Sequence, residues 1–124
     1  MATSRQMLLV IASLVAVASW PHGADAGSLS VLTSDPAAEA IIDGRHAGYL
    51  IRFDGPVDHA SSRLQITQSG HVIQSLVPRL DSAVDVLYAS GQAPAPGHYL
   101  LHWEARSLDR EISKGDIPFT VGSN

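Results

Sequence analysis

The chain has 124 residues and a formal net charge of −4, so a single domain is expected, without a surface that attracts nucleic acid or anionic lipid over long range. It contains no cysteine, which excludes a disulfide framework and thiolate metal sites. The fold therefore has to be held together by its apolar core.

The first 26 residues have the three parts of a secretory signal peptide. Arg5 precedes an apolar run from Met7 to Trp20, and the polar stretch after it ends in Ala24-Asp25-Ala26, a small-x-small cleavage signal. The run has 14 residues, fewer than the ~20 that a membrane-spanning helix needs, so an uncleaved anchor is the less favoured alternative. The sequence predicts a signal peptide over residues 1–26 and a mature domain over residues 27–124.

The mature chain alternates apolar and polar residues with a period of two, which is typical of half-buried β-strands. The clearest case is YLLHWEARS, in which Tyr99, Leu101, Trp103 and Ala105 share one face. No stretch has the period of an amphipathic helix. Seven strands are predicted, at residues 29–33, 49–53, 63–68, 72–77, 84–88, 99–107 and 117–121.

Turn signals separate these strands. Ser69-Gly70 predicts a hairpin turn, and Asp54-Gly55-Pro56 and the Pro-rich stretch 93–97 predict loops. Short strands with turn signals every ~10 residues favour an all-β sandwich. Pro118 predicts an edge position or a bulge in the last strand, because proline has no N–H to donate to a sheet.

Two aromatic residues of the 99–107 strand are interpreted as structural. Tyr99 follows a Pro-Gly loop, as in the tyrosine corner of immunoglobulin-like sandwiches, where the hydroxyl bonds back to the loop backbone. An ordinary buried tyrosine is an equally favoured alternative. Trp103 is interpreted as a central core anchor.

Motifs of the common enzyme classes are missing. The chain has no G-x-S-x-G, H-E-x-x-H, P-loop or dinucleotide fingerprint, so an enzyme is the least favoured function. The histidines have no metal-binding spacing, and His98 and His102 would lie ~13 Å apart along one strand, too far to chelate one ion together. The mature chain has no methionine, so a thioether site for Cu(I) is not expected.

One charged turn, in EARSLDREISKG at residues 104–115, is a candidate site. Asp109 and Glu111 are two residues apart, so in an extended backbone their carboxylates would point the same way and could bind a cation. The alternative is a solvated hairpin turn in which Arg110 and Lys114 offset the acids. Spacing alone favours the solvated turn.

Four segments follow the signal peptide in a characteristic order: SDPA at 34–37, IRFDGPVD at 51–58, PGHYLLHWEARSLD at 96–109 and GDIPFTV at 115–121. Together they resemble the CopC-like family of periplasmic copper-resistance proteins over nearly the whole mature chain. The resemblance implies a seven-stranded Greek-key β-sandwich of immunoglobulin-like topology. It also implies a periplasmic protein that binds or carries copper ions in copper homeostasis.

The resemblance further implies a Cu(II) site formed by an N-terminal histidine and by the aspartate and histidine of an Asp-x-His turn. Asp109 keeps the aspartate, whereas Glu111 stands at the histidine position and Arg110 at the middle position. The terminal histidine falls near Ser28. The predicted metal ligands are therefore Asp109 and Glu111, in a weakened or non-standard site that favours Cu(II) over Cu(I).

A second function remains open. The chain is alternatively a diverged, metal-free sandwich that works as an interaction module and docks on a membrane or periplasmic partner. An integral-membrane copper-transport protein is the candidate partner, because members of the resembling family can be encoded with, or fused to, such a protein. The chain itself is not expected to span the membrane once the signal is removed.

Overall fold

A computed structural model describes residues 28–123. The predicted signal peptide, residue 27 and residue 124 lie outside the described residues. The described chain forms a 3₁₀ turn η1 (His59–Ser61) and eight strands: β1 (Val31–Asp35), β2 (Ala40–Ile42), β3 (Gly48–Phe53), β4 (Arg63–Gln68), β5 (His71–Leu76), β6 (Val86–Ser90), β7 (Gly97–Arg106) and β8 (Ile112–Val121).

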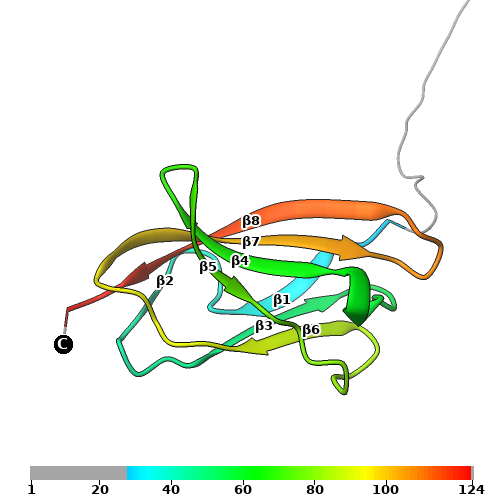
Figure 1. Cartoon of the computed structure of the whole chain (residues 1–124), viewed down its shortest axis with the longest axis horizontal. Coiled ribbons are helices and arrows are strands. Elements are labelled where there is room, and N and C mark those ends of the chain that lie inside the picture. The colour runs from blue at the N-terminus through cyan, green and yellow to red at the C-terminus, as the bar shows by residue number, and fades with distance from the viewer. Residues whose placement is uncertain (1–27, 124) are drawn as a thin grey trace, which may run out of the picture.

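The strands form two layers that pack face to face (Figure 1). One sheet has the order β1-β3-β6 and the other the order β2-β8-β7-β4-β5. The predicted all-β sandwich is thus confirmed, with one strand more than expected. The additional strand, β2, pairs in parallel with residues 119–121 of β8. Its three residues are too few to show a period in the sequence.

The core lies between the two sheets and is built by the predicted alternation. The inward residues of β7, which include Tyr99, Leu101 and Trp103, are all buried. The Trp103 ring meets the ring of Phe53 from β3 edge-on, with centroids 5.2 Å apart. Since this contact joins the two sheets, Trp103 is confirmed as a core anchor.

The tyrosine corner is present. The Tyr99 hydroxyl donates a hydrogen bond to the carbonyl of Ala95, four residues earlier in the loop. The ring stacks on Phe119 of β8 with centroids 5.8 Å apart. The alternative of an ordinary buried tyrosine is thereby excluded, and the loop before β7 is fixed to the core.

Of the two predictions for Pro118, the bulge was wrong, whereas the side of Pro118 away from β7 does lie where β8 begins to lose its second neighbour. The register of β8 with β7 runs without a shift, and on its other side β8 pairs with β2 only over residues 119–121. The carbonyl of Pro118 accepts from the N–H of Glu39, on the side away from β7. Because the N–H and C=O of a strand residue point to the same side, the missing N–H of Pro118 removes no bond between β7 and β8.

Several segments of the chain lie close together at one end of the sandwich. The start of the described chain and the turn from β7 to β8 lie side by side there (Figure 1). The base of the turn is joined to the loop after β3 by a bridge between Val57 and Ser107. Within residues 28–123, no helix has the length and hydropathy to cross a membrane.

Candidate metal site

The turn from β7 to β8 is fixed by Ser107, which is buried. The Ser107 N–H donates to the carbonyl of Glu111 at 2.9 Å, and its hydroxyl accepts from the Glu111 N–H at 3.2 Å. The Arg110 N–H donates to the Ser107 carbonyl at 2.9 Å. These three bonds close the loop on itself, so that Asp109 is held on a defined turn and its side chain remains exposed.

The start of the described chain is attached next to this turn. Leu29 is buried, and its N–H donates to the hydroxyl of Ser113 on β8 at 3.0 Å. The Ser30 N–H donates to Oδ1 of Asp54 at 3.0 Å, while the Asp54 N–H donates to the Ser30 carbonyl at 3.0 Å. Neither Asp54 nor Ser113 was singled out from the sequence, because no local pattern signals contacts between such distant segments.

A pocket of about 450 Å³ lies where these segments meet. It brings together the chain start, the loop after β3 and the turn, and its two carboxylates are those of Asp54 and Asp109. The residues that line it are Ser28, Leu29, Asp54, Gly55, Pro56, Ser107, Leu108 and Asp109. Asp109 and the start of the described chain therefore line the same pocket.

The two predicted ligands do not share this pocket. Arg110, between them, has a φ of 70°, in the left-handed region, so the backbone is not extended from Asp109 to Glu111. Of the two, only Asp109 lines the pocket. In the described part of the chain, no three histidine, aspartate or glutamate side chains gather closely enough to hold a metal ion.

The turn also carries positive charge. The Ser61 hydroxyl, the backbone N–H groups of Ala60 and Ser61 and, least of all, the charge of Arg110 together hold the pKa of Asp58 below its ordinary value, although burial acts in the opposite direction. The guanidinium of Arg106 donates to the carbonyl of Arg110 at 3.4 Å. A cation bound at Asp109 would thus lie next to a fixed positive charge, which weakens its binding.

The histidines on β7 have structural partners. His102 lies between two carboxylates, with Nδ1 2.9 Å from Asp116 and Nε2 3.4 Å from Glu104. Nδ1 of His98 is 2.9 Å from the hydroxyl of Thr120. Each ring thus contacts residues on its own or the neighbouring strand, as expected if the two histidines do not chelate one ion.

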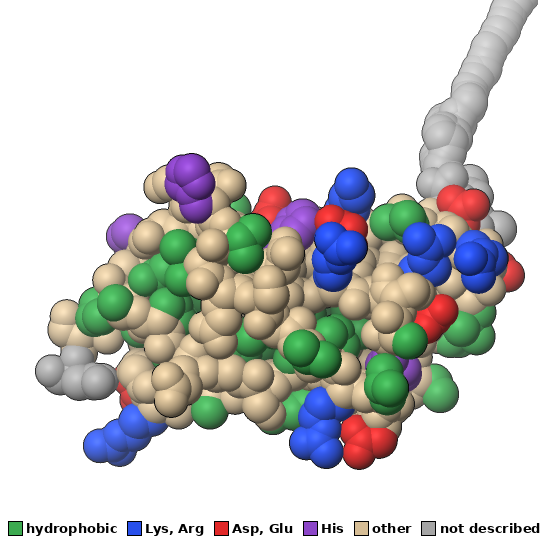
Figure 2. Space-filling model, viewed as in Figure 1, with side chains coloured by type: hydrophobic (Ala, Val, Ile, Leu, Met, Phe, Trp, Pro, Cys, Tyr) green, Lys and Arg blue, Asp and Glu red, His purple; other side chains and the backbone are tan. Residues whose placement is uncertain are grey.

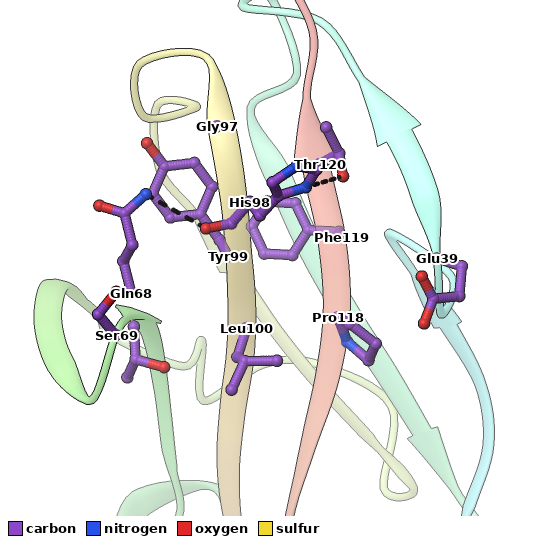
Figure 3. A pocket seen from close by; sticks show the side chains of 11 residues that line it. Glu39, Gln68, Ser69, Gly97, His98, Tyr99, Leu100, Pro118, Phe119 and Thr120 are labelled. Atoms are coloured by element: carbon purple, nitrogen blue, oxygen red, sulfur yellow. Dashed lines mark hydrogen bonds between the residues drawn. The ribbon is translucent and has the colours of Figure 1, made fainter.

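A second hollow lies on the outer face of the five-stranded sheet, with a volume of about 570 Å³. His98 and Leu100 of β7 border it, and Glu39 lies on the other side of β8 (Figure 3). Its only imidazole among the described residues is that of His98, which is bonded to Thr120. It therefore offers no converging set of ligands, and the pocket at Asp109 remains the better candidate.

The chain is similar to known proteins in sequence and in fold. A family model, described as the CopC domain, matches residues 31–122. The structure of CopC from Methylosinus trichosporium OB3b superposes with a TM-score of 0.68 and 23% identity, over 78% of this chain and 96% of that one. PcoC, described as a methionine-rich copper resistance protein from Escherichia coli, superposes with a TM-score of 0.59 and 20% identity, over 75% and 97%.

No curated protein has significant sequence similarity to the chain. At these identities, the two solved structures establish the fold alone. The family model extends from the first residue of β1 to the residue after β8. The chain therefore belongs to the CopC family.

Proposed function

We propose that the protein binds copper ions in the periplasm and carries them in copper homeostasis, as a binding protein and not as an enzyme. The observation that carries this proposal is the CopC domain match together with the pocket that Asp109 and the start of the described chain both line. The similarity to PcoC, described as a copper resistance protein, supports it. The signal peptide predicted at residues 1–26 would direct the chain to the periplasm.

The ligand that we propose in the pocket is the carboxylate of Asp109, with the amine of the mature chain start as a further donor; Glu111 could join them only if its side chain turned toward the pocket, which it does not line. Oxygen and amine nitrogen donors suit Cu(II) better than Cu(I). The chain differs from methionine-rich PcoC in this respect, because its two methionines, Met1 and Met7, both lie in the predicted signal peptide. With Glu111 and Ser28 in place of histidines, and with Arg110 nearby, we expect weaker binding than a site with histidine ligands provides.

Cu(II) titration of the secreted protein tests this proposal, after its N-terminus has been read by intact mass. We expect one Cu(II) per chain and the EPR spectrum of a tetragonal site with mixed nitrogen and oxygen ligands. Binding that does not saturate, at the level of a generic acidic surface, would contradict the proposal. A chain that starts at residue 27 carries its amine one residue before Ser28, which lines the pocket.

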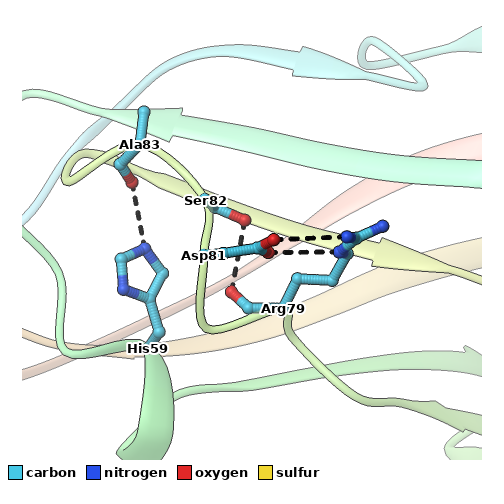
Figure 4. A network of polar contacts seen from close by, with 5 residues as sticks. All are labelled: His59, Arg79, Asp81, Ser82 and Ala83. Carbon is cyan, nitrogen blue, oxygen red and sulfur yellow. Dashed lines mark hydrogen bonds and ion pairs between the residues drawn. The ribbon is translucent and has the colours of Figure 1, made fainter.

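A second candidate function, docking on a partner protein, is supported by an apolar surface between β5 and β6. Val77, Leu80 and Val84 are 81%, 71% and 70% exposed. The segment is attached to the rest of the protein by a hydrogen bond between the His59 ring and the Ala83 carbonyl, and the Arg79–Asp81 ion pair lies within the segment (Figure 4). Hydrophobic side chains gather beside a basic and an acidic residue at the lower edge of the molecule (Figure 2). Exposed apolar residues on an ordered segment are typical of a protein-binding surface.

A double substitution tests this second candidate. Leu80→Ser with Val84→Ser should abolish copper-independent retention of a membrane protein from periplasm-containing membranes, because it removes apolar area from the contact. Ile41→Ser is the matched control, since Ile41 is 76% exposed but lies on β2. Equal retention by wild type and both variants would exclude this surface as the docking site.

A further inference from the structure

The exposed apolar side chains of the described chain are concentrated in one segment. Of the ten large apolar residues that are exposed in residues 28–123, five lie within residues 72–84: Val72, Ile73, Val77, Leu80 and Val84. This segment covers most of β5 and most of the connection from β5 to β6. Such a concentration is typical of a surface that another protein covers.

A hollow of about 400 Å³ lies beside the connection, on the outer face of the three-stranded sheet. Leu50, Val86 and Tyr88 form its apolar part, and residues 79 and 81–83 of the connection form its other side. Leu80, which is 71% exposed, lies in sequence between two of these lining residues. A protruding leucine and a hollow with an apolar lining, here called the Tyr88 hollow, are thus neighbours on one surface.

Hydrogen bonds hold the connection in place. The Arg79 N–H donates to the Tyr88 carbonyl at 2.8 Å, and the Val84 carbonyl accepts from the Val57 N–H at 2.8 Å. Within the connection, the Ser82 hydroxyl donates to the Arg79 carbonyl at 3.2 Å (Figure 4). Because the exposed leucine is carried by a backbone that is already ordered, its burial by a partner costs little backbone entropy.

The charges of this surface are neutralised within the chain. Arg79 pairs with Asp81, with 3.2 Å between Nε and Oδ1, and Asp85 pairs with Arg52 of β3, with 3.3 Å between Oδ2 and Nε. Residues 72–85 contain no other charged residue. A strongly acidic or basic partner would therefore meet no unpaired opposite charge here. Two copies of a chain with a net charge of −4 repel each other, so a surface without unpaired charge is where they associate most easily.

We propose that a second copy of the chain covers this surface, in a two-fold symmetric dimer in which Leu80 of each copy lies in the Tyr88 hollow of the other. A two-fold interface requires that one surface carries both of the features that fit together, and a leucine next to an apolar hollow meets this requirement. The inference rests on the docking surface of the second candidate function and gives it an occupant. It does not depend on copper binding.

Sedimentation equilibrium of the secreted, metal-free protein tests the dimer. We expect a monomer–dimer equilibrium with a dissociation constant on the order of 10–100 µM, because the interface is small. Leu80→Ser should raise this constant at least tenfold, since each dimer loses two buried leucine side chains. Ile41→Ser is the matched control and should leave it unchanged, because Ile41 is 76% exposed but lies on β2.

Two further variants test the fit of the leucine in the hollow. Val86→Thr keeps the shape of the lining but places a hydroxyl against the leucine of the other copy, so the dissociation constant should rise about three- to tenfold. Leu80→Met keeps the volume and the apolar character of the side chain, so the constant should stay within about threefold of wild type.

The outcomes separate this inference from the second candidate function. A wild-type chain that stays monomeric up to about 500 µM would overturn the dimer, and so would a dimer of equal strength in Leu80→Ser. A dimer that is weakened by Leu80→Ser but not by Val86→Thr would overturn the placement of the leucine in the Tyr88 hollow. Failure of the second candidate function has a different signature, in which no membrane protein is retained while the dimer is still formed.

Discussion

Replacing Gly115 by alanine is expected to destabilise the protein by about 1–3 kcal/mol, although alanine normally fits a strand better than glycine does. Gly115 on β8 is paired with Trp103 on β7, and the indole lies directly over it. A Cβ at this position would lie 2.6 Å from Cζ2 and 2.9 Å from Nε1 of the indole. The ring would have to move, and with it the contact to Phe53 in the other sheet.

Substitutions of Trp103 test whether the contact between the indole and position 115 causes this loss of stability. Trp103→Ala alone should cost about 3–5 kcal/mol, since it empties a large volume in the core. In the Trp103→Phe background, the smaller ring leaves room, so Gly115→Ala should cost at least about 1 kcal/mol less than in wild type. Urea denaturation followed by circular dichroism, which needs no tryptophan signal, measures the free energies of unfolding of wild type and of the four variants.

Gly122→Ala provides the control for this series. A Cβ there meets Ile41 at 3.5 Å and the Ile42 carbonyl at 3.7 Å, which are ordinary contact distances. We expect a change within about 0.5 kcal/mol. If Gly115→Ala changes stability as little as Gly122→Ala, or costs the same in both backgrounds, packing between Trp103 and Gly115 is not the constraint on position 115.

The same pair of strands shows why the sequence predicts one strand fully and the other only in part. In β7, every inward position is apolar, so the period of two is visible from Tyr99 to Ala105. In β8, the inward positions before Ile117 are Ser113 and Gly115. Ser113 accepts a hydrogen bond from the Leu29 N–H, and Gly115 leaves room for the indole of Trp103. Because neither residue has a large apolar side chain, the sequence predicts a charged turn over the first half of β8.

The sequence likewise predicts one part of the candidate site and not another. Asp109 could be singled out because an aspartate in a charged turn after a clear strand has a local signal, and the resemblance to CopC-like proteins reinforced it. Only the resemblance implies that Asp109 lies near the chain start; no local pattern of residues predicts it, since the arrangement depends on bonds to Asp54 and Ser113 that join distant segments. The expectation that Asp109 and Glu111 point the same way assumed an extended backbone, which the left-handed conformation of Arg110 excludes.

Asp109→Asn is expected to reduce Cu(II) affinity at least tenfold, because it removes the charge of the proposed ligand that lines the pocket. Glu111→Gln should have a smaller effect, since Glu111 does not line it. Competition titration against a chelator of known affinity gives the dissociation constants. Asp81→Asn is the matched control, because Asp81 is an exposed aspartate that pairs with Arg79 on the segment between β5 and β6.

A gain of affinity is a stricter test than a loss, because damage to the fold cannot produce it. Glu111→His restores the histidine that the resemblance implies for this turn, and an imidazole is a better Cu(II) ligand than a carboxylate. We expect tighter Cu(II) binding by at least tenfold, with more nitrogen coupling in the EPR spectrum. The gain should disappear when Asp109→Asn is added, since it requires the imidazole to turn toward the pocket and reach the ion held at Asp109. A Glu111→His variant that binds Cu(II) no more tightly than wild type would place the metal elsewhere or exclude it from this turn.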